Sequence, residues 1–175
     1  MKLENRKIID RSLEDVYALV RDDLEKLVPY MPNVDKINKV STKNHDDGVD
    51  IVNHWYAKAE VPGLLKKFLN PDLLSWKDYA HWKNAEHLVE YKLESTLGND
   101  LFDAKGVNYF KDAGDNKTEL VVTCDVVIYA DKVPGIPRLI AKKALPLIEG
   151  LIEKILGPNL TALGDGLNKY FKENS

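Results

Sequence analysis

Large aromatic side chains recur on alternate residues of several predicted strands, together with a few polar residues. Alternate side chains of a strand point to the same face, and over 49–61 the set that includes Ile51, Asn53 and Trp55 is the more apolar one. Such rings could line a mostly apolar pocket in which a few polar groups orient a ligand. They could equally fill an ordinary core, because aromatic residues bury large areas and favour strands. The candidate ligand-binding residues are Ile51, Asn53, Trp55, Trp76, Asp78, Tyr91, Phe102, Asn108, Phe110, Ile148, Leu151 and Ile155.

Asp78 is the acid that this alternation places among the aromatic residues. A carboxyl group buried there would have a raised pKa and could act as a general acid or base. A small shift of register would instead place Asp78 at a solvated bend of the strand. We favour the second interpretation, because a single carboxylate does not make an active site.

Other chemistries find little support. The four histidines, His45, His54, His81 and His87, lack the spacing of metal ligands. The single cysteine, Cys124, cannot form an internal disulfide and has no recognisable neighbouring base, so it is expected to be a small buried apolar residue. A net charge of −3 makes nucleic acid a poor partner. We therefore expect no catalytic residues, no metal and no cofactor.

The elements that must position these residues follow a simple order. Ser12 and Asp15 form a capping-box pattern, and an apolar face predicts a helix over 13–28 that Pro29 ends. Polar turn segments then separate alternating runs, which is typical of hairpins and gives an antiparallel sheet of about seven strands. The expected strands are 2–10, 34–43, 49–61, 74–83, 87–95, 101–111 and 117–130.

Two features interrupt this strand pattern. Residues 62–73 (PGLLKKFLNPDL) predict a short helix over 64–69 that caps one end of the sheet or acts as a gate. Gly106, inside a predicted strand, indicates a bend or bulge of the kind that a strongly curved sheet requires.

Residues 137–171 form the longest amphipathic segment, with Ile148, Leu151 and Ile155 on its apolar face. Fully helical, it would be on the order of 50 Å long and would need a large apolar surface, such as a curled sheet, to pack against. Pro146 and Gly157-Pro158 lie within it, so we expect a kinked helix or two or three helical pieces.

The same segment could also contact a membrane surface transiently, with Lys142 and Lys143 near lipid headgroups. Glu149 and Glu153 weaken that interpretation, and packing against the sheet is the better use of the apolar face. Neither a signal peptide nor a transmembrane stretch is recognisable, so a cytoplasmic protein is expected.

The order of elements also carries a resemblance. It rests on Ile9 to Tyr17 (IDRSLEDVY), the turn Met31 to Val34, Gly106 with Phe110, and a last strand from Thr118 to Ile128 that leads into the long helix. This arrangement resembles the helix-grip fold of the START and birch-pollen-allergen-like (SRPBCC) superfamily, which includes lipid-transfer domains and polyketide cyclases. The resemblance implies an α+β fold, one ligand-binding domain over 1–175, and an apolar cavity between a curved sheet and the C-terminal helix.

Three functions remain open. The leading hypothesis is binding or transport of a hydrophobic small molecule or lipid in that cavity, without catalysis. The second is a polyketide cyclase- or dehydratase-like enzyme that uses Asp78, His54, His81 and Tyr91. The third is a regulatory module that binds a partner through residues 62–71.

Overall fold

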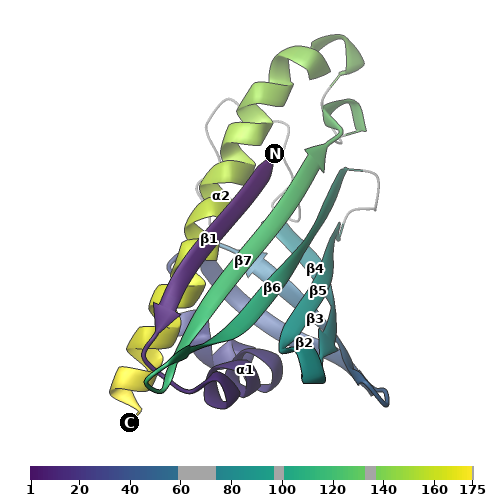
Figure 1. The fold of residues 1–175 in the computed structure, drawn as a ribbon. Helices are drawn as coiled ribbons and strands as arrows, with labels where there is room; N and C mark the ends of the chain where they lie inside the picture. Colours follow the sequence, from purple (N-terminus) through teal and green to yellow (C-terminus); the bar gives the residue numbers. More distant parts are fainter. Residues whose placement is uncertain (59–73, 97–100, 133–136, 175) are drawn as a thin grey trace.

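The computed structural model describes residues 1–58, 74–96, 101–132 and 137–174 of the 175-residue chain. Its strands form one antiparallel sheet in the order β1-β7-β6-β5-β4-β3-β2, so β1 and β2 are the edges. Figure 1 shows the sheet curling around the molecule, with α2 running alongside β1 and α1 near one end. The strands are β1 (Lys2–Ile9), β2 (Val34–Asn44), β3 (Gly48–Ala57), β4 (Ser75–Lys83), β5 (Leu88–Ser95), β6 (Phe102–Gly114) and β7 (Lys117–Ile128).

The helical region after β1 begins as the sequence indicates. The Ser12 hydroxyl accepts a hydrogen bond from the Asp15 backbone N–H at 3.3 Å, which caps α1 (Leu13–Asp22). The chain then continues as a 3₁₀ helix, η1 (Leu24–Tyr30), so the predicted helix over 13–28 is two elements. Both bury their apolar faces in the main core.

The three predicted hairpins are confirmed as the pairs β2–β3, β4–β5 and β6–β7. Short 3₁₀ helices follow two of the strands, η3 (Asn84–Glu86) after β4 and η4 (Ala130–Lys132) after β7. Residues 59–73 lie outside the described part of the chain, and with them the predicted helix over 64–69 and the partner-binding segment.

The expected bulge at Gly106 does not occur as a change of register. Gly106 stays opposite Tyr91 on β5, and the shifts of register lie within β2 and near the end of β6. The pairing of β6 with β7 is interrupted at Gly106 and Val107, but it resumes in the same register at Asn108. What requires glycine here is a close approach. A Cβ atom on Gly106 would lie 1.9 Å from the Thr123 carbonyl oxygen and 2.6 Å from the Tyr91 hydroxyl oxygen.

The C-terminal segment is one continuous helix, α2 (Arg138–Glu173), so the expectation of two or three separate pieces is wrong. Pro146 and Pro158 lie inside it. Each removes one backbone hydrogen bond to the residue four positions earlier, here Lys142 and Lys154. All four of these residues are exposed, so water can solvate the freed carbonyl groups and the helix continues through both prolines.

The second half of α2 lies close against β1 and η1. Gly164 permits this contact, because a Cβ atom there would lie 2.7 Å from the side chain of Lys7. The Asn168 side chain accepts a hydrogen bond from the Asp10 N–H and donates one to the Ile8 carbonyl oxygen, each at 2.9 Å. These contacts fix the part of α2 that faces the inside of the sheet.

Candidate ligand-binding cavity

A partly enclosed cavity lies between the inner face of the sheet and the second half of α2. The cavity volume, counted as the space in which the centre of a water molecule fits, is about 100 Å³. On the same measure, one water needs roughly 10–15 Å³. A cavity of about 150 Å³ holds benzene in another protein, so this space suits several waters or one small ring. Most of the lining is apolar and comes from five strands, α1, η1, Met31 and α2.

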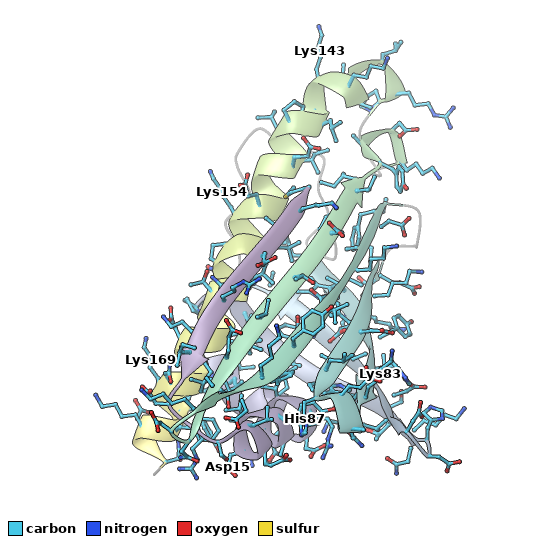
Figure 2. The ribbon with its side chains drawn as sticks, viewed as in Figure 1. Asp15, Lys83, His87, Lys143, Lys154 and Lys169 are labelled. Carbon is cyan, nitrogen blue, oxygen red and sulfur yellow. The ribbon has the colours of Figure 1, made fainter. Side chains whose placement is uncertain are left out.

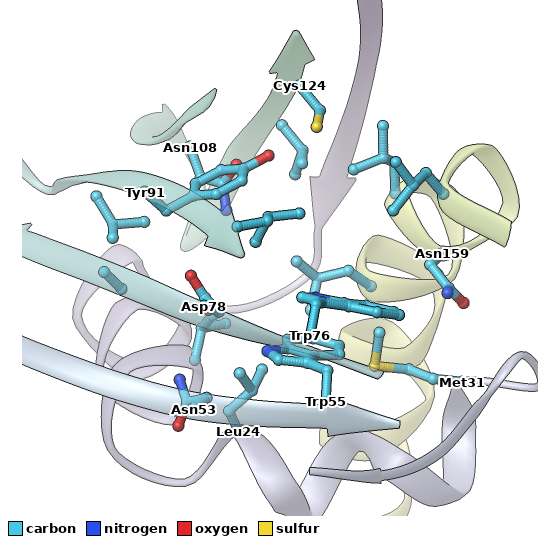
Figure 3. Close-up of a pocket in the computed structure, with 18 of the residues that line it drawn as sticks. Leu24, Met31, Asn53, Trp55, Trp76, Asp78, Tyr91, Asn108, Cys124 and Asn159 are labelled. Carbon is cyan, nitrogen blue, oxygen red and sulfur yellow. The ribbon is translucent and has the colours of Figure 1, made fainter. Parts of the chain in front are cut away.

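Two tryptophans form the most ordered part of the lining. Trp55 on β3 and Trp76 on β4 are register partners, and their rings are stacked with centroids 6.0 Å apart and planes 13° apart. Figure 3 shows them side by side, with Met31 beside them and Asn159 on α2 beyond. A third tryptophan, Trp82, also lines the cavity and packs against Tyr17 and Phe110.

Asp78 faces this cavity, so the interpretation that placed it at a solvated bend is wrong. It pairs in unbroken register with Asn53 and Leu93, and Figure 3 shows its side chain directed from β4 toward Tyr91 and Asn108. Burial raises the pKa of Asp78 to about 7, and the nearby Trp55 and Asn53 side chains oppose that rise. The Trp55 indole lies close enough to affect the pKa of Asp78 but does not form a hydrogen bond of good geometry with it. Neither the indole nitrogen nor Asp78 Oδ1 has a hydrogen-bond partner among the described residues.

Tyr91 shows how a polar group in this cavity can be satisfied. Its hydroxyl donates a hydrogen bond to the Thr123 carbonyl oxygen at 2.5 Å, across the space that Gly106 leaves free. Burial raises the pKa of the Tyr91 hydroxyl above its usual range, and burial also raises the pKa of the Cys124 thiol. Both groups therefore line the cavity in their neutral forms.

Several other buried polar atoms around the cavity have no hydrogen-bond partner among the described residues. They belong to five lining residues: Trp55 Nε1, Trp82 Nε1, Asp78 Oδ1, Asn108 Oδ1, and Nδ2 and Oδ1 of Asn159. A buried polar atom left unpaired costs about 1–3 kcal/mol, and native proteins leave few such atoms. Water molecules or polar atoms of a bound molecule in the cavity could satisfy them.

The structure brings half of the sequence-predicted site residues together. Asn53, Trp55, Trp76, Asp78, Tyr91 and Asn108 line the cavity. Four others pack into hydrophobic clusters instead of lining it: Ile51 and Phe110 in the main core, Ile148 in a smaller cluster toward the N-terminal end of α2, and Phe102 in that cluster and in a third one around Leu93 and Cys124. The side chains of Leu151 and Ile155 lie outside the described part of the structure.

Sequence reasoning did not select Asn159, Leu156, Leu160 and Leu163, which α2 contributes to the cavity. The signal for Asn159 was available. It falls between Leu156 and Leu163 at helical spacing, so a polar residue occupies the apolar face of the helix. A buried asparagine at such a position needs partners, and the described residues provide none for its side chain.

The histidines do not join Asp78. His54 stacks on Tyr56, and its Nδ1 shares a hydrogen bond with the Tyr56 hydroxyl. His81 pairs with Asp50 on the outer face of the sheet. No group of three or more histidine, cysteine, aspartate or glutamate residues in the described part of the chain is placed to hold a metal ion. Among the ionisable lining residues, Asp78 is therefore the one whose pKa lies near neutrality.

The fold is shared with solved structures. The chain is similar to Zhui aromatase/cyclase from Streptomyces sp. R1128, with a TM-score of 0.69 and 16% identity over 98% of this chain and 95% of that one. It is also similar to norcoclaurine synthase from Thalictrum flavum, with a TM-score of 0.60 and 16% identity over 99% of this chain and 87% of the other. For a START superfamily protein from Mycobacterium smegmatis, the TM-score is 0.57, with 16% identity over 99% of both chains.

These similarities establish the helix-grip, α+β fold expected from the order of elements. At such low identity they do not establish an activity. No protein-family model matches the sequence, and no curated protein matches it. Within the described residues, no helix is long and apolar enough to cross a membrane.

Proposed function

We propose that this protein binds a mostly apolar small molecule in the cavity between the sheet and the second half of α2. The observation that carries the proposal is the set of unpaired polar atoms around an aromatic-lined space. An ordinary core would either pair such atoms or replace them with apolar groups. The fold supports the proposal, because structural neighbours include a START superfamily protein and an aromatase/cyclase.

The experiment is calorimetric titration with para-propylphenol, a small ring compound with one hydroxyl group. Saturable binding at one site is expected, and Ala80→Leu should weaken it because Ala80 lines the cavity and the larger side chain would take up space in it. Val40→Leu is the matched control, since Val40 is exposed on the edge strand β2. Equal binding by both variants, with both shown to be folded by circular dichroism, would refute this site.

A cyclase- or dehydratase-like enzyme is the second candidate, and Asp78 is the observation that favours it. A carboxyl group with a pKa of about 7 can both accept and donate protons near neutral pH. We rank it second because His54 and His81, which were to act with Asp78, lie on the other face of the sheet. Turnover of a bound ring ketone that Asp78→Asn abolishes, without loss of binding, would move catalysis to first place.

A transient membrane contact is a separate proposal that rests on the first turns of α2. Leu139 and Leu147 are exposed there beside Lys142 and Lys143, and Figure 2 shows Lys143 at the far end of the helix. An apolar and basic helix face suits an anionic bilayer. Vesicle flotation should show binding to anionic and not to neutral lipid, reduced by Leu139→Ser and unaffected by Val40→Ser. Equal flotation of the two variants would exclude this surface.

A further inference from the structure

The polar atoms around the cavity define a pattern that a ligand must match. Donors without an acceptor among the described residues come from Trp55, Trp82 and the amide nitrogen of Asn159. Acceptors without a donor there are the side-chain oxygens of Asn108 and Asn159 and Oδ1 of Asp78. Hydroxyl and carbonyl oxygens accept hydrogen bonds from such donors, and a hydroxyl can also donate. An ammonium group has no acceptor and would leave the indole and amide N–H groups unpaired. A plain hydrocarbon would leave every one of these atoms unpaired.

The shape of the lining favours a ring. The near-parallel faces of Trp55 and Trp76 border the cavity, and flat rings gain from stacked or edge-on contact with other aromatic rings. Leucines of α2, η1 and β5 supply further apolar surface. A ring with a polar substituent would use both the flat faces and the unpaired atoms.

The charges of the lining work against anions. Among the described lining residues, Asp78 is the one with a carboxyl group. The other ionisable lining residues, Tyr91 and Cys124, have raised pKa values and stay neutral because they are buried. No lysine or arginine is among the described lining residues. A carboxylate that entered would lose its hydration without gaining a cation, and an ionised Asp78 would repel it.

From these three observations we infer that the cavity selects uncharged ring compounds that carry a hydroxyl or carbonyl group, and that it rejects anions such as fatty-acid carboxylates. This inference rests on the proposed function, because it concerns the same cavity. It assigns Asp78 a role in selectivity: the residue sets the charge that a ligand can have.

The test compares three ligands of nearly the same shape by calorimetry at about pH 8, where Asp78 is ionised. They are para-propylbenzamide, which is neutral and polar, para-propylbenzoate, which is its anionic counterpart, and propylbenzene, which has no polar group. We expect the amide to bind at least about tenfold more tightly than the benzoate, since like charges in a poorly hydrated site repel strongly. Propylbenzene should bind more weakly than the amide.

Two variants assign the effect. Asp78→Asn should bring the benzoate closer to the amide by strengthening its binding, whereas Asp50→Asn on the outer face should leave the ratio unchanged. If none of the three ligands binds the unmodified protein, the proposed function fails. If they bind but the benzoate matches or exceeds the amide, or if the two variants change the ratio equally, the selectivity inference alone is overturned.

Discussion

Two aspartates on neighbouring strands face opposite sides of the same sheet. Asp50 on β3 lies outside and has 44% of its side chain exposed, with His81 Nδ1 and His45 Nε2 each 2.6 Å from one of its oxygens. Asp78 on β4 lies inside, and its Oδ1 has no partner among the described residues. The hydrogen bonds from His81 and His45 lower the pKa of Asp50, whereas burial raises the pKa of Asp78 to about 7.

The difference shows how one sheet supports two kinds of carboxyl group. A partnered carboxylate on the outer face needs nothing more, because its two histidines and the surrounding water satisfy it. The inner carboxyl group has an oxygen, Oδ1, without a hydrogen-bond partner among the described residues, and its burial makes it resist ionisation. The inner environment thus leaves Asp78 Oδ1 in need of a hydrogen-bond partner, while the outer one makes Asp50 a local structural group.

The largest expected effect is on the pH dependence of stability. A folded-state pKa of about 7 against 3.8 for the exposed group means that folded Asp78 holds its proton where unfolded Asp78 does not. Stability from this group is therefore greatest below about pH 4 and falls as the pH rises toward 7. The total loss is at most about 4 kcal/mol, and Asp78→Asn should remove it.

Urea unfolding of both proteins at about pH 4 and pH 8 measures this difference. The variant should be more stable than the unmodified protein at the higher pH and nearly equal at the lower one. Water that enters the cavity reduces the size of the effect but not its sign. A stability difference that stays constant with pH would show that Asp78 ionises as easily as a surface carboxyl group.

Gly106→Ala tests the hydrogen bond of the Tyr91 hydroxyl, the cavity group that has a partner. The added methyl group would collide with the Thr123 carbonyl oxygen and with Tyr91, which should displace the hydroxyl from its hydrogen bond. Overpacking of this kind costs about 1–3 kcal/mol. Thermal unfolding gives the cost. If the Tyr91 contact is its main source, Gly106→Ala/Tyr91→Phe should recover most of the lost stability. A double variant as unstable as Gly106→Ala alone would exclude that contact as the main source.

Trp55→Phe tests how the indole affects the pKa of the inner aspartate, Asp78. The indole opposes the rise in the pKa of Asp78, so its removal should raise that pKa further. A carboxyl carbon NMR titration of Asp78 follows the change directly. An unaltered or lower pKa would mean that the indole N–H does not act on this carboxyl group.

Asp50→Asn should have the smallest effect. Exposed ion pairs contribute roughly 0–1 kcal/mol, and Asp50 is well solvated. Chemical unfolding should therefore show a loss below about 1 kcal/mol. A loss as large as that from a core substitution would mean that the His45–Asp50–His81 cluster anchors the β2–β3 hairpin.

Much of this arrangement could be predicted from the sequence, because strand alternation and helical spacing are local patterns. They placed Trp55, Trp76 and Asp78 on one face, and the cavity confirms that they lie together. The state of Asp78 could not be predicted in this way. Whether a carboxyl group finds water or only apolar neighbours depends on how α2 closes over the sheet, which is a long-range property.

The continuity of α2 has a similar explanation. Pro146 and Pro158 predict interruptions, but both face solvent, where a lost hydrogen bond costs less. Phe102 and Ile148 were predicted to line the cavity, and they do not line it. Both pack instead in a cluster toward the N-terminal end of α2. Sequence periodicity gives the face of a residue but not its distance along the cavity.

The three tryptophans of the chain offer the most direct test of ligand binding, because all three line the cavity. Their indole N–H signals in a nitrogen–proton correlation spectrum can be followed during titration with para-propylbenzamide. The account predicts that all three signals shift and reach saturation at one equivalent of bound ligand. Indole signals that remain in place up to the solubility limit of the ligand would contradict it.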